Sequence, residues 1–184
     1  MSTPADASVV QSPVLSRALA AACVAVALLL PLGVALALWL MPVEALLQRL
    51  GLPGMGVSGD ALQPWQRHAG WLLGMVPASC AACGLWHARR CFLHFARGDY
   101  FAEAAIGSLR GFSVGMLAAA VAGIVVPSLA SVVLSWELGP GRRQLAVAVS
   151  SNDLLLLLFA AVVWQIAVAM RRAAALAQEN AAFV

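Results

Sequence analysis

The sequence predicts an all-α fold, an integral membrane bundle of four transmembrane helices, on three observations. Hydrophobic residues make up 62% of the 184 residues and charged residues only 10%, whereas soluble domains contain about half and about 25%. Four apolar runs are long enough to cross ~30 Å of hydrocarbon at ~1.5 Å per residue. Charged residues, glycine and proline collect in the intervals between those runs. We therefore expect residues 1–184 to form a single membrane domain.

The first span is predicted at residues 18–41, directly after Arg17. A signal peptide is the alternative, because a basic residue precedes the apolar core, but the apolar region of a signal peptide is at most about 15 residues long. We therefore expect an uncleaved first span. The interval that follows, 42–69, is rich in glycine and proline and carries charges of both signs. It predicts an exposed connection with one short amphipathic helix at 43–50.

The remaining three spans are predicted at 71–90, 108–138 and 153–171, and the second is expected to continue as helix to His94. The third is longer than one bilayer crossing and contains Pro127, so it is expected to tilt, to project from the membrane or to kink at the proline. Asp153 is expected to cap the start of the fourth helix. Beyond that span, the tail 171–184 is expected to extend the helix into the cytoplasm.

The distribution of arginine predicts that both termini are cytoplasmic. With the N-terminus inside, the inner side holds seven arginines and the outer side four, while the acidic residues divide equally. An excess of basic residues marks the cytoplasmic side of a membrane protein. The seven inner arginines are Arg17, Arg89, Arg90, Arg97, Arg110, Arg171 and Arg172. Four tryptophans are expected near the outer interface, namely Trp39, Trp65, Trp71 and Trp136.

The interval 89–112 is the predicted cytoplasmic loop and the main candidate for a functional surface. Asp99 can cap a helix that begins at Tyr100. Four apolar residues then recur on one face of that helix, namely Phe101, Ala105, Leu109 and Phe112. One interpretation is a connection whose apolar face lies on the membrane surface. The other is a docking surface for a partner protein.

Three stretches of the chain, RGDYFAEAAIGSLRGF, SSNDLLLLL and the closing AAALAQENAAFV, resemble a family of bacterial four-span membrane proteins catalogued only as a domain of unknown function. The resemblance covers the chain from the second span to the C-terminus. Family members often carry a hydroxyl residue after the phenylalanine and an asparagine three residues later, where this chain has Ala102 and Ala105. The residues that match the family pattern are Gly98, Phe101, Leu109, Arg110, Glu179, Asn180 and Val184.

Members of this family are frequently encoded beside a small helix-turn-helix regulator. The resemblance therefore implies a location in the bacterial inner membrane and a cytoplasmic transcription regulator as the partner. The expected partner-binding residues are Arg97, Gly98, Phe101, Leu109, Arg110, Glu179 and Asn180. The net charge of +3 is too small to indicate direct binding of nucleic acid.

A row of cysteine and histidine residues on the second span offers a different kind of site, made of Cys80, Cys83, His87, Cys91 and His94. Their spacings are three, four, four and three, so all five project within an arc of roughly 80° on one helix face. These side chains are ligands for zinc, copper or haem iron. The alternative is a helix-packing seam, for which membrane proteins use small residues.

Enzymatic activity is not indicated, because the chain contains no phosphate-binding glycine loop, no H-E-x-x-H motif and no serine nucleophile elbow. No acidic residue falls in the middle of a predicted span, which is unfavourable for proton-coupled transport. Gln165 is expected to form an interhelical hydrogen bond. We therefore predict a non-enzymatic membrane partner of a cytoplasmic regulator without a required cofactor. The alternatives are a metal- or haem-binding membrane protein, and a small-molecule transporter or channel built as a homo-oligomer.

Overall fold

The computed structural model describes residues 13–40, 42, 45, 64–134 and 149–181. These residues form four long helices and no strand. All four helices are long and apolar enough to cross a membrane, so the predicted all-α architecture of four membrane helices is confirmed. The helices are α1 (Pro13–Leu40), α3 (Pro64–Phe95), α4 (Glu103–Leu134) and α5 (Ser151–Ala181).

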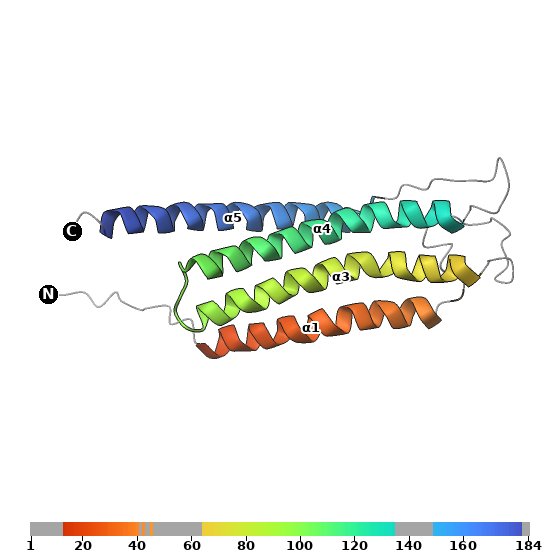
Figure 1. The fold of residues 1–184 in the computed structure, drawn as a ribbon, viewed down its shortest axis with the longest axis horizontal. Helices are drawn as coiled ribbons and strands as arrows, with labels where there is room; N and C mark the ends of the chain where they lie inside the picture. The colour runs from red at the N-terminus through yellow and green to blue at the C-terminus, as the bar shows by residue number, and fades with distance from the viewer. Residues whose placement is uncertain (1–12, 41, 43–44, 46–63, 135–148, 182–184) are drawn as a thin grey trace.

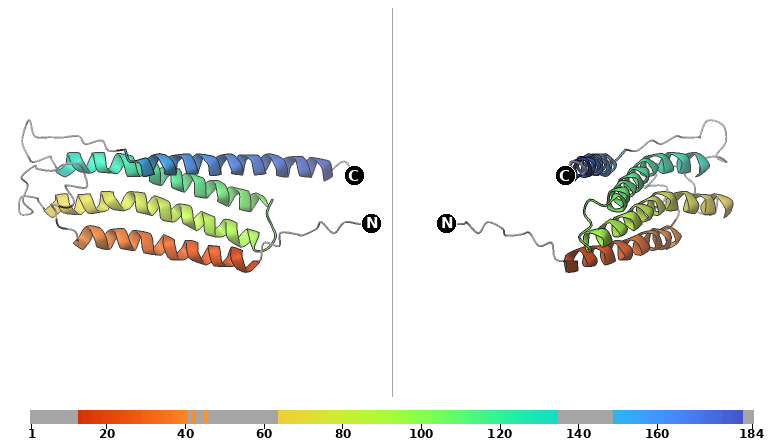
Figure 2. Two further views of the ribbon diagram at one scale, coloured as in Figure 1. Left: turned by 180° about the vertical axis from the view of Figure 1, so that it is seen from behind. Right: turned by 60° about the vertical axis from the view of Figure 1, so that its left-hand side comes forward.

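The four helices pack in chain order, α1 on α3, α3 on α4, and α4 on α5. Each runs antiparallel to the one before it, so that the start of α1, the connection between α3 and α4, and the end of α5 all lie at one end of the molecule (Figures 1 and 2). We call this the turn end. Because α3 and α4 each contact two neighbours, they form the centre of the bundle, and α1 and α5 flank them.

Two helices begin before the predicted membrane spans. α1 begins at Pro13 rather than at residue 18, because the fixed φ of proline suits the first helical position. α3 begins at Pro64 rather than at 71, so the end of the predicted exposed connection is helical. The end of α3 at Phe95 agrees with the expected continuation of that helix to His94, and with the start of α4 at Glu103 most of the interval 89–112 is helical.

Several predictions fall on residues outside the described part. The connection after α1 is described only at Pro42 and Ala45, where the Ala45 amide donates to the Pro42 carbonyl at 3.1 Å. Most of the short helix predicted at 43–50 lies outside the described residues, as do Trp136 and the end of the third span beyond Leu134. Within α4, the helix continues through Pro127 without ending.

α3 and α4 approach each other closely at Gly84 and Gly115. A methyl group added at Gly115 would lie 2.6 Å from the backbone nitrogen of Gly84 and 3.2 Å from the Cys80 carbonyl oxygen. No side chain fits between the two backbones at this point. Membrane helices pack through such small residues because they gain little from burying apolar surface against one another in lipid.

Polar side chains join three helices at the end opposite the turn end. The Trp71 indole Nε1 donates to the Ala35 carbonyl of α1 at 3.3 Å, and the Gln66 Nε2 donates to the Val133 carbonyl of α4 at 3.2 Å. Gln66 is 1% exposed. These bonds place the start of α3 level with the ends of α1 and α4. Trp71 is therefore partly used for helix packing rather than only as an interfacial residue.

α5 packs against α4 through three buried alanines, Ala160, Ala167 and Ala174. Their spacing of seven residues keeps them on one face of the helix. Beside this stripe, the ring of Phe159 makes an edge-to-face contact with Phe112 of α4, with centroids 6.2 Å apart. These contacts between α4 and α5 are made by side chains, whereas α3 and α4 meet at the backbones of Gly84 and Gly115.

Ser150 and Asp153 cap the start of α5 reciprocally. The Asp153 amide donates to the Ser150 hydroxyl at 3.2 Å, and the Ser150 amide donates to Asp153 Oδ2 at 2.9 Å. This arrangement is a capping box with the serine at the N-cap and the acid three residues later. Asp153 does stabilise the helix start, as predicted, but the N-cap itself is Ser150.

The start of α5 lies beside the interior of α4 rather than beside its end. A methyl group added at Gly123 would lie 3.2 Å from Oδ1 of Asp153, and Gly123 is far from either end of α4. As a result, α5 is displaced along α4 and its last turns extend past the turn end (Figure 1). This offset also places a carboxylate against the interior of a membrane helix, which the span boundaries did not predict.

Candidate functional site

The connection between α3 and α4 is a compact turn at residues 96–102. Gly98 has a φ of +85°, which an L-residue with a side chain adopts only at a cost. The Gly98 amide donates to the Phe95 carbonyl, and the Asp99 amide donates to the His94 carbonyl, both at 3.1 Å. This is the Schellman arrangement that closes a helix. The rings of Phe95 and Tyr100 pack 5.4 Å apart across it, so the turn has a defined shape.

The prediction that Asp99 caps a helix beginning at Tyr100 is wrong. α4 begins at Glu103, and the carbonyl that accepts its first helical bond is that of Ala102, from the Ile106 amide at 3.1 Å. Asp99 belongs to the preceding turn, because its amide is used to close α3. The left-handed glycine before it therefore decides where one helix ends and the next can start.

The apolar face predicted for the loop lies inside the bundle rather than on the membrane surface. Ala105 is 1% exposed, Leu109 is half-buried and Phe112 contacts α5. These residues belong to α4, which has helices on two sides. Phe101 is the exception, since it precedes the helix and is 61% exposed.

Two arginines near the turn end stack on tryptophans, a pairing that the sequence interpretation missed. The Arg110 guanidinium lies 4.6 Å from the Trp164 ring of α5, and the Arg89 guanidinium lies 5.0 Å from the Trp86 ring within α3. Cation–π contacts of this kind suit the boundary between lipid and water. The Arg89 pair could have been found from its spacing of three residues, whereas the Arg110 pair depends on the offset of α5.

The predicted partner-binding residues are thus separated by the structure. Arg97, Gly98 and Phe101 lie together on the turn and are exposed. Leu109 and Arg110 are engaged with the helices of the bundle. The remaining two, Glu179 and Asn180, belong to the last turns of α5, where the structure describes the backbone but not the side chains.

The cysteine and histidine row follows α3 as predicted, but its members do not gather with other ligands. Cys91 is buried at 3% exposure, whereas Cys83 is exposed. The His87 ring occupies the space beside Gly111 of α4, where an added methyl group would lie 2.6 Å from Nδ1. Within the described residues, no group of three or more histidine, cysteine, aspartate or glutamate side chains could hold a metal ion. His87, at least, is used in packing.

Gln165 lies on the exposed side of α5 and lines a shallow depression together with Arg172 and Leu176. The structure shows no hydrogen bond from Gln165 to another described helix. Among residues 13–40, 64–134 and 149–181, the predicted interhelical bond of Gln165 is therefore not found.

Comparison with known proteins adds no relative to these observations. Protein-family models, curated proteins and solved structures contain no match to this chain. The family resemblance of the turn region stays a prediction.

Proposed function

We propose that this protein is a non-enzymatic membrane partner that binds a cytoplasmic regulatory protein at its turn end. The observation that carries the proposal is Phe101, a large aromatic side chain that is 61% exposed on a turn of defined shape. Aromatic residues presented in this way are the usual anchors of protein interfaces. A fixed backbone reduces the entropy lost when a partner binds.

The surroundings of Phe101 support a docking surface of mixed character. Arg97 and Asp99 are exposed on the same turn, which provides charges of both signs around the aromatic ring. α5 extends past the turn end (Figure 1), so its last turns offer a second surface beside the turn. A partner could contact both surfaces at once.

The proposal places the turn end in the cytoplasm, following the excess of arginine on that side. The partner that we propose is a small helix-turn-helix regulator, as the family resemblance implies. Holding such a protein at the membrane would remove it from DNA. If the regulator binds one packing of the helices better than another, a shift to the other packing would release it.

Purification of the full-length chain from its native membrane in mild detergent tests the proposal, with the co-purifying proteins identified by mass spectrometry. The wild-type chain should retain a small helix-turn-helix protein. The double variant Arg97→Ala/Phe101→Ala should retain at least tenfold less of that protein, as expected for an aromatic anchor worth about 2 kcal/mol. Leu29→Ala, which removes an exposed side chain from α1, is the control and should retain the partner.

Two outcomes would contradict the proposal. Recovery of the wild-type chain without any stoichiometric partner would exclude stable capture. Equal recovery of the regulator with the turn variant and with Leu29→Ala would show that the turn is not part of the binding surface. Leu109 and Arg110 are left unchanged in this design, because both contribute to helix packing.

A further inference from the structure

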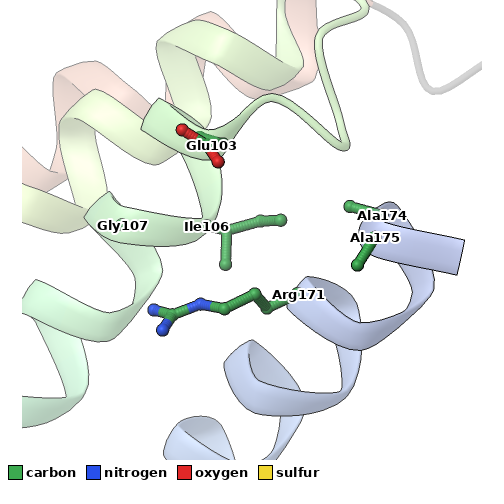
Figure 3. Close-up of a pocket in the computed structure, with 6 residues that line it drawn as sticks. All are labelled: Glu103, Ile106, Gly107, Arg171, Ala174 and Ala175. Carbon is green, nitrogen blue, oxygen red and sulfur yellow. The ribbon is translucent and has the colours of Figure 1, made fainter. Parts of the chain in front are cut away.

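A cavity of about 330 Å³ lies between the first turns of α4 and the part of α5 around residues 171–175. Its walls come from α4 and α5, from segments around residues 103–107 and 171–175 (Figure 3). It is lined by Glu103, Ile106, Gly107, Arg171, Ala174 and Ala175. The cavity is close to the turn but is made of different residues from the proposed docking surface.

The cavity presents one positive and one negative side chain, Arg171 and Glu103. The Arg171 side chain extends from α5 toward α4, the Glu103 carboxylate lies on the other side of Ile106, and the two form no ion pair (Figure 3). Both residues are exposed to the surroundings. A ligand that carries a positive and a negative group could satisfy both charges at once.

The position of the cavity along the helices matches the headgroup layer of a bilayer. The apolar run of α5 ends at Met170, directly before Arg171. On α4, the Arg110 guanidinium stacks on Trp164 about two turns further into the bundle than Glu103. Arginine and tryptophan collect at the interface between lipid and water, so the cavity lies at the polar side of that interface.

One exposed face of α4 continues from the cavity toward the centre of the bundle. Glu103 and Gly107 line the cavity, and the next exposed positions at helical spacing are Arg110, Val114 and Leu117. Residues three or four apart share one face of a helix. A molecule held in the cavity by its head can therefore lay a hydrocarbon chain along Val114 and Leu117.

We propose that this cavity binds one phospholipid with a phosphoethanolamine headgroup, from the leaflet at the turn end. Arg171 binds the phosphate, since guanidinium groups pair well with phosphate oxygens. The Glu103 carboxylate accepts hydrogen bonds from the primary ammonium. A choline headgroup has no N–H to donate, and an anionic headgroup without an amine leaves the carboxylate facing a phosphate. Charge complementarity thus selects the ethanolamine lipid.

The test is native mass spectrometry of the delipidated full-length chain after exchange into bilayer discs that contain phosphatidylethanolamine, phosphatidylcholine or phosphatidylglycerol. One phosphatidylethanolamine molecule should be retained, about tenfold more than either other lipid. Glu103→Gln and Arg171→Gln should each lower its retention about tenfold, the loss expected for one charge-assisted hydrogen bond. Arg172→Gln is the matched control, because Arg172 is the next residue on α5 and does not line this cavity.

Equal retention of the three lipids, or an equal loss with Arg172→Gln and Arg171→Gln, would overturn the proposal. Displacement of the bound lipid by millimolar free phosphoethanolamine would show a site for a soluble headgroup compound and would overturn the lipid as the ligand. Arg171→Lys keeps the charge and should retain most of the binding, which separates loss of the phosphate contact from a disturbed fold. Circular dichroism of each variant should match the wild-type spectrum.

Discussion

The two interfaces of α4 differ in how they are fixed. Toward α3, the backbones meet at Gly84 and Gly115, so that any shift along the axis would bring other side chains into the contact. Toward α5, contact is made by alanines at a spacing of seven residues and by aromatic rings, and the helix is offset along its partner. The α3–α4 pair therefore has one geometry set by steric contact, whereas the register of α5 depends on a few side-chain contacts.

The largest effect is expected at the close approach of α3 and α4. Gly115→Ala would place a methyl group 2.6 Å from the Gly84 nitrogen, so the backbones must separate. The free energy of unfolding should fall by about 3 kcal/mol, as for overpacked cores. Thermal unfolding in detergent, followed by circular dichroism, measures the change. Gly33→Ala is the control, because nothing lies within 4 Å of the added atom, and equal stability of the two variants would contradict the steric account.

The turn that joins the same two helices should respond less strongly. Gly98→Ala forces a side chain into the left-handed region at a φ of +85° and should lower the free energy of unfolding by about 1.5 kcal/mol. Asparagine tolerates this region better than alanine, so Gly98→Asn should recover part of the loss. If alanine and asparagine destabilise the chain equally in thermal unfolding, backbone strain is not the cause.

A smaller effect is expected at the start of α5. Ser150→Ala removes the hydroxyl that accepts from the Asp153 amide and should destabilise the helix start by about 1 kcal/mol. Hydrogen exchange should speed up at the first amides of α5 and stay unchanged in α3. Ser79→Ala is the control, since its hydroxyl donates to the Met75 carbonyl of its own helix. Unchanged exchange in α5 would mean that the capping box does not hold the helix start.

The smallest effect is expected from the stacked pair between α4 and α5. A double-mutant cycle with Arg110→Gln and Trp164→Leu should give a coupling energy of about 0.5 kcal/mol in thermal unfolding. The Arg89–Trp86 pair makes a similar contact within one helix, so its removal should leave the α4–α5 distance between paired spin labels unchanged. The Arg110 variant should broaden the distribution of that distance. A narrow, unchanged distance would show that the register of α5 does not depend on this contact.

The architecture could be predicted from the sequence because apolar length alone decides which segments can cross a bilayer. All four predicted spans fall on the four helices. Helix ends were less accurate, since they depend on local contacts. Pro13 and Pro64 start helices that were predicted to begin later, and the hydrogen bonds around Gly98 moved the start of α4 from Tyr100 to Glu103.

The arrangement of the candidate sites could not be predicted, because it depends on which helix faces meet. Hydropathy gives each span a length but no register against its neighbours, so the contact of Asp153 with Gly123 and the stacking of Arg110 on Trp164 had no signal in the sequence. The cysteine and histidine row does lie on one helix, α3. Whether such a row forms a metal site depends on the residues of the neighbouring helix. Here Gly111 of α4, which has no side chain to bind a metal, lies beside His87.

The most direct test of the proposed docking surface is photo-crosslinking in living cells from a benzoylphenylalanine introduced at position 101. The side chain of Phe101 is 61% exposed on the turn, so the probe should form an adduct with one small soluble protein of the helix-turn-helix class. The same probe in place of Leu29, on the exposed side of α1, should give no such adduct. Absence of a protein adduct at position 101, or the same adduct from both positions, would contradict the assignment of the turn as the surface that binds the partner.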